Sequence, residues 1–121
     1  MASNKRLLKK EIRIICGALA GECVVAKMTV PGIDREKLNA IIYELADLQE
    51  NAIHRISITF PQSEKSFSNG QEYRKARRAY FAAAFSKLKS EFNAHIDQII
   101  KQMNAVLPQE QKDANIASLK A

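Results

Sequence analysis

The chain has 121 residues, of which 46% are hydrophobic, and it contains no Trp, only 4 Gly and only 3 Pro. This length supports one hydrophobic core and excludes two ordinary domains, while the scarcity of Gly and Pro favours helix over strand. A formal charge of +6 permits binding to polyanions without requiring it.

The first predicted helix covers residues 4–27. Apolar and small residues recur along it in steps of three and four, at Leu8, Ile12, Ile15, Leu19, Cys23 and Ala26. Ser3 or Asn4 can cap its start, and Val30-Pro31-Gly32 ends it. Gly17 and Gly21 lie inside this helix, where each costs up to ~1 kcal/mol relative to Ala. We therefore expect a neighbouring helix to pack closely against them.

The second predicted helix covers residues 34–59 and starts at Asp34, a favourable capping residue. Its buried face comprises Leu38, Ile41, Ile42, Leu45, Leu48, Ala52, Ile56 and Phe60. The run from Ile56 to Phe60 alternates like a strand, but no partner run exists, so we interpret it as the last helical turns or an extended exit. A Ser-rich loop over residues 61–70 follows.

The third predicted helix covers residues 71–107, a run of 37 residues without Gly or Pro. Its apolar and aromatic residues recur mostly every three or four positions, which is the period of one helix face. At about 1.5 Å per residue the helix spans roughly 55 Å, against ~36 Å and ~39 Å for the first two. Pro108 interrupts it, and the tail over residues 108–121 holds too little apolar area for more than a weak, short fourth helix.

These elements predict an all-α, single-domain fold: an antiparallel up-down-up three-helix bundle over residues 1–107 with a weakly structured tail. Because the third helix is longest, we expect its carboxyl end to project from the bundle. The residues that would then lie bare include Ile96, Ile99, Ile100, Met103 and Val106. A second copy of the chain can cover them, which predicts a homodimer; the tail folding back is the alternative.

Several short motifs resemble a family of small, uncharacterised bacterial helical proteins. They are Asn4-Lys5-Arg6-Leu7-Leu8-Lys9-Lys10, Ile15-Cys16, Glu22-Cys23-Val24 and His54-Arg55-Ile56-Ser57. The resemblance reaches from about Asn4 to Met103 and implies a helical bundle. It implies no activity, so no functional residue is carried over.

Basic residues gather where the first and third helices begin, which an up-down-up topology places at the same end. This basic pole comprises Lys5, Arg6, Lys9, Lys10, Arg13, Arg74, Lys75, Arg77 and Arg78. Residues 1–13 hold five basic side chains and one acidic, and residues 64–78 hold five and two, so these segments account for the whole net charge. The pole can bind nucleic acid or another polyanion, with Tyr73 and Tyr80 stacking on bases; otherwise it is a solvated basic surface.

The sequence gives little sign of catalysis, so we expect no enzyme, no catalytic residues and no cofactor. Glu50 and His54, like Glu91 and His95, are four residues apart, which differs from the Glu-x-x-His spacing of di-iron bundles, and we expect no metal site. Cys16 and Cys23, seven residues apart on one helix, cannot reach each other and are expected to be reduced core residues.

Charged residues interrupt the apolar part of the amino terminus, so we do not expect a secretion signal. No apolar run approaches the ~18 residues that span a bilayer, which argues against integral membrane association and favours a cytoplasmic protein. The chief functional hypothesis is a non-enzymatic helical scaffold or protein-interaction module with an unknown partner. The alternative is binding of nucleic acid or polyanions through the basic pole.

Overall fold

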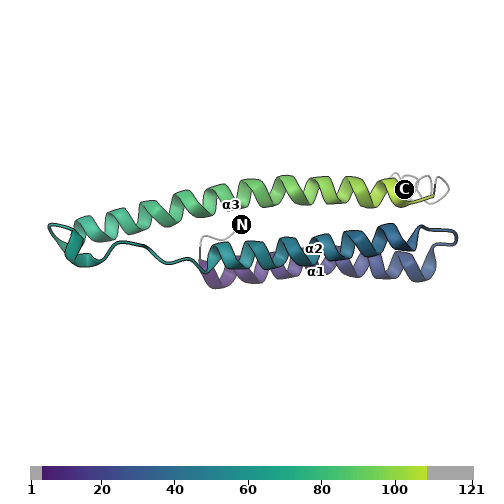
Figure 1. The fold of residues 1–121 in the computed structure, drawn as a ribbon, viewed down its shortest axis with the longest axis horizontal. Helices are drawn as coiled ribbons and strands as arrows, with labels where there is room; N and C mark the ends of the chain where they lie inside the picture. The colour runs from purple at the N-terminus through teal and green to yellow at the C-terminus, as the bar shows by residue number, and fades with distance from the viewer. Residues whose placement is uncertain (1–3, 109–121) are drawn as a thin grey trace, which may run out of the picture.

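Three α-helices form most of residues 4–108, the part of the chain that this computed structural model describes (Figure 1). They are α1 (Lys5–Thr29), α2 (Arg35–Ile56) and α3 (Gly70–Val106), with a short 3-10 turn, η1 (Glu64–Ser66), between α2 and α3. No strand occurs within the described residues, which confirms the all-α class. The predicted fourth helix and the rest of the tail beyond Pro108 lie outside the described residues.

A polar side chain caps the start of each α-helix. The Oδ1 atoms of Asn4, Asp34 and Asn69 accept hydrogen bonds from backbone N–H groups in the first turns of α1, α2 and α3. These bonds satisfy donors that would otherwise lack a helical partner. At its other end α2 stops at Ile56, three residues before the predicted bound, and the strand-like run that follows is an extended exit.

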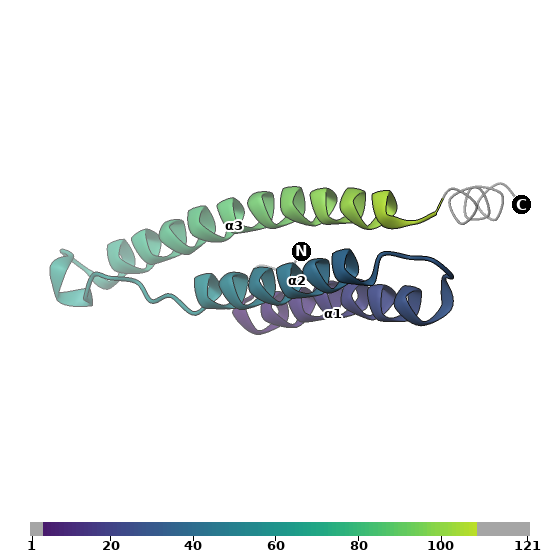
Figure 2. The same ribbon diagram turned by 45° about the vertical axis from the view of Figure 1, so that its right-hand side comes forward.

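The helices alternate in direction, with α1 and α2 forming a hairpin and α3 lying along α2 (Figures 1 and 2). The core runs along this contact, and each large side chain buried there contributes about 1.5–3 kcal/mol. Its fully buried members include Leu8, Ile12 and Cys23 of α1, Leu38, Leu45 and Ile56 of α2, and Leu88, Phe92 and Ile99 of α3.

The helix α3 is displaced along the hairpin so that its first turns, rather than its last, extend beyond the end of α2 (Figure 1). The connection between α2 and α3 runs on past the end of α2 before the chain reverses into α3. The first buried residue of α3 is therefore as late as Phe85. The expectation that the carboxyl end of α3 lies bare is therefore wrong. Ile99 is 0% exposed and Ile96 is buried, Met103 and Val106 pack partly buried against the core, and Ile100 alone of the five is exposed.

An aromatic cluster covers the projecting turns of α3. Phe60 and Phe67, from the connection, lie against Tyr73 and Tyr80 of α3 with ring centroids 5.4–5.7 Å apart. Tyr80 also contacts Phe81, which continues the cluster toward the main core. The chain thus supplies its own cover for this end of α3, and a second copy is not needed there.

Candidate functional site

The side of α1 that faces away from α2 is unusually apolar for an exposed surface. Of the seven large hydrophobic side chains that are exposed among residues 4–108, five belong to α1: Leu7, Ile14, Val24, Val25 and Met28. Ile14 and Val25 are each 58% exposed and Met28 is 78% exposed. Together with Gly17, Ala18 and Gly21, which are also exposed, these five residues make up the apolar part of the outer face of α1. The exposed Lys10, three residues after Leu7 and four before Ile14, lies on the same side.

The spacing along α1 explains why these side chains share one face. Leu7, Ile14, Gly21 and Met28 recur every seven residues, and Ala18 and Val25 fall between them on the same side. The residues that pack on α2, such as Ile12 and Cys23, occupy the opposite side. α1 therefore carries large apolar side chains on two sides, with Lys10 interrupting the exposed one between Leu7 and Ile14. Exposed apolar side chains gathered on one helix face usually mark an interaction site.

Gly17 and Gly21 do not pack against another helix in this structure. A Cβ atom built on either glycine would meet nothing within 4 Å, so the expectation of a close intramolecular neighbour is wrong. Both residues nevertheless lie in the middle of α1, where Gly costs about 0.5–1 kcal/mol relative to Ala. The monomer gains no packing at these positions that would offset this cost.

Two residues of the basic pole, one from α1 and one from α3, meet at the ring of Phe81. The Nζ of Lys5, at the start of α1, lies 4.6 Å from the ring centroid, and the Cζ of Arg77 lies 5.1 Å from it. Lys5 also donates a hydrogen bond of 2.8 Å to the carbonyl oxygen of Ile58. The structure thus brings together basic residues from the starts of α1 and α3, as the topology predicts.

The predicted pole residues of α3 gather around two surface hollows, one lined by Arg74, Arg77 and Arg78 and the other by Arg74, Lys75 and Arg78, and neither is lined by a residue of α1. Lys9 is half-buried, whereas Arg6, Lys10, Arg13, Arg74, Lys75 and Arg78 are exposed. None of the nine pole residues forms a salt bridge with a carboxylate within residues 4–108.

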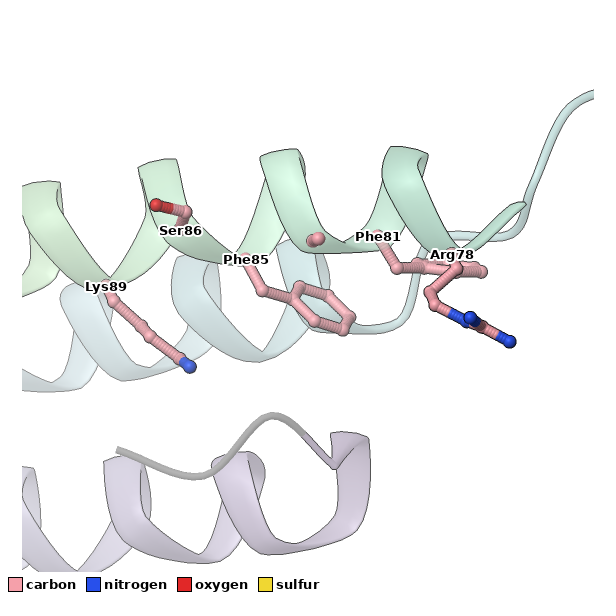
Figure 3. Close-up of a pocket in the computed structure, with 6 residues that line it drawn as sticks. Arg78, Phe81, Phe85, Ser86 and Lys89 are labelled. Atoms are coloured by element: carbon pink, nitrogen blue, oxygen red, sulfur yellow. The ribbon is translucent and has the colours of Figure 1, made fainter. Parts of the chain in front are cut away.

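A pocket of about 470 Å³ lies beside the pole on α3 (Figure 3). Phe81 and Phe85 form its apolar part, and Arg78 and Lys89 lie toward its two ends, with Arg78, Phe85 and Lys89 pointing to the same side of α3. Tyr73 and Tyr80 are half-buried against Phe60, so only part of each ring is open to a base, and stacking on bases stays a prediction.

His95 and Glu91 of α3 each contact a side chain of α2. The Nε2 of His95 lies 2.9 Å from the Oε1 of Glu44 and so links α3 to α2, and Glu91 binds Arg55 of α2 at 2.7 Å. No three His, Cys, Asp or Glu side chains within the described part of the chain are grouped to hold a metal ion.

Both cysteines are buried and free. Burial raises the pKa of the Cys16 thiol, and burial together with the neighbouring Glu22 carboxylate raises the pKa of Cys23. Each thiol is therefore held in its neutral, poorly nucleophilic form.

Comparison of the chain with protein-family models, with curated proteins and with solved structures finds no match. The resemblance to small bacterial helical proteins therefore stays a prediction. Among residues 4–108, no helix combines the length and the apolar character needed to cross a bilayer.

Proposed function

We propose that this chain is a non-enzymatic helical interaction module that works through the outer face of α1. The observation that carries the proposal is the exposure of five large apolar side chains on one side of one helix. Leaving such a face in water forgoes about 25 cal/mol for each Å² of apolar surface that a partner could cover. A bound protein partner recovers that free energy, and the central glycines let its backbone approach closely.

Other features of the described residues agree with a binding role. The cysteine thiols have raised pKa values, which makes them poor nucleophiles, and the His95 ring is held against Glu44.

A photo-crosslinking side chain tests the outer face directly. In the test variant the photo-crosslinking residue replaces Ala18, at the centre of the face. In the control variant it replaces Ala46, which is exposed on α2. After irradiation in the producing cells, we expect protein adducts from position 18 and none from position 46. Equal labelling from both positions, or none from position 18, would contradict the proposed surface.

A second candidate function is polyanion binding at the basic pole. The specific observation in its favour is that Lys5 and Arg77, from two helices, lie over one aromatic ring, beside further exposed basic residues of both helices. Clustered cations attract phosphates, and counterions are released when the phosphates bind.

Salt-dependent binding to single-stranded RNA and to duplex DNA tests this candidate. Affinity should fall steeply as salt rises, with a logarithmic slope of about −0.7 to −0.9 for each phosphate contact. Replacing Arg74, Arg77 and Arg78 together with Gln should weaken binding and reduce the slope. The control with the same charge change replaces Arg35, Lys37 and Lys101, which are exposed away from the pole. No binding at low salt, or equal losses in both variants, would rule out the pole as a polyanion site.

A further inference from the structure

We propose that the partner of the outer face of α1 is the same face of a second copy of this chain, with the two α1 helices antiparallel and related by a two-fold axis near Gly17 and Ala18. This inference rests on the proposed function of that face. It differs from the dimer expected from the sequence, which used residues of α3 that the structure places mostly in the core.

The central pair of side chains is complementary in size about that axis, and an apolar pair lies on either side of it. Ile14 and Gly21 are equally distant from the midpoint between Gly17 and Ala18, as are Leu7 and Met28. In an antiparallel pair, each Ile14 therefore lies opposite a glycine of the other copy, where a Cβ would meet open space in the monomer. Large side chains opposite small ones let two helices interdigitate at close range.

Charge selects the antiparallel direction over the parallel one. Residues 5–13 hold five basic side chains and one acidic, whereas residues 14–29 hold one of each. A parallel pair would place the two basic segments side by side, and like charges in contact oppose association. An antiparallel pair places each basic segment beside a neutral one and puts the two basic poles at opposite ends of the dimer.

The length of α1 limits the affinity of such a dimer. Its 25 residues form a rod of roughly 37 Å, so one helix pair buries an area at or below the lower end of the ~1,200–2,000 Å² of stable complexes. We therefore expect reversible association with a dissociation constant in the micromolar range.

Single cysteines on the exposed face report the direction of the helices. Ala18→Cys lies close to the axis and should form disulfide-linked dimers under mild oxidation. Leu7→Cys should crosslink to Met28→Cys when the two variants are mixed, but not to itself. The unmodified chain is the blank, because Cys16 and Cys23 are buried. If Leu7→Cys instead crosslinks to itself, and Met28→Cys also crosslinks to itself, the helices are parallel and the proposed arrangement is overturned.

Sedimentation equilibrium of the full chain tests the association itself. The unmodified protein should form a dimer that dissociates on dilution, and Ile14→Gln combined with Val25→Gln should raise the dissociation constant at least tenfold. Tyr43→Gln is the matched control, since Tyr43 is 71% exposed on α2, and it should leave the constant unchanged. A monomer from micromolar to millimolar concentration would overturn the second-copy proposal. If the protein is a monomer but the crosslinker at position 18 labels a different protein, the proposed function stands and only the second-copy proposal falls. If there is neither a dimer nor an adduct at position 18, both proposals fall.

Discussion

The Nζ of Lys5 lies 4.6 Å from the centroid of the Phe81 ring, a contact that joins the start of α1 to α3. Phe81 also contacts Phe85 in the main core and Tyr80 in the aromatic cluster over the projecting turns. One ring therefore connects the core, the aromatic cluster and the basic pole.

Phe81→Ala should lower the free energy of unfolding by about 2 kcal/mol, less than the ~3–5 kcal/mol of a fully buried Phe, because Phe81 is only half-buried. Lys5→Gln removes the cation alone and should cost less than about 1 kcal/mol. Urea unfolding at fixed protein concentration measures both. Equal effects of the two substitutions would show that the ring contributes nothing beyond its contact with Lys5.

Ile99→Glu should unfold the chain instead of producing folded monomers, because Ile99 is 0% exposed and a carboxylate there would lose its hydration. Ile100→Glu, at a position 38% exposed, provides the neighbouring control and should leave the helix content unchanged. Circular dichroism and thermal unfolding distinguish the two variants. A folded Ile99→Glu protein would contradict the burial of this end of α3.

Gly17→Ala and Gly21→Ala should each stabilise the dilute monomer by about 0.5–1 kcal/mol, since the new methyl group meets open space and Ala is the better helix former. Thermal unfolding at concentrations below dimer dissociation measures the gain. A loss of stability in either variant would mean that the glycine packs against something in the monomer.

The buried thiols predict a loss of stability in alkaline solution. Burial raises the pKa of Cys16 and of Cys23 in the folded chain, so above about pH 8.5 the unfolded chain releases thiol protons that the folded chain retains. The unfolding free energy of the unmodified chain, relative to a Cys16→Ala and Cys23→Ala variant, should therefore fall between about pH 7 and pH 10. A difference that stays constant over this range would contradict the raised pKa values.

Local chemistry made the helices predictable. Asn4 and Asp34 occupy the capping positions that their side chains indicate. The bounds of α1 and α3 lie within two residues of those predicted, whereas α2 ends three residues early. These signals depend only on neighbours within a turn or two, which is why they can be identified without tertiary information.

The position of α3 along α2 could not be predicted because it depends on contacts between distant residues. Phe60 and Phe67 pack against Tyr73 at one end of α3, and Ile99 is buried in the core near the other end. The outer face of α1 was also missed, although Leu7, Ile14 and Met28 carried its seven-residue spacing. Two apolar sides on one helix cannot be ranked from sequence alone, since periodicity does not show which side the rest of the chain covers.

The most direct measurement of the central claim is the solvent accessibility of the Ile14 and Val25 methyl groups, followed by NMR with a soluble paramagnetic agent at increasing protein concentration. We expect these methyl signals to become protected as concentration rises and to be exposed again on dilution, while the Tyr43 ring stays exposed throughout. Methyl groups of Ile14 and Val25 that remain as accessible as Tyr43 at every concentration, and after addition of the protein that crosslinks to position 18, would contradict the account.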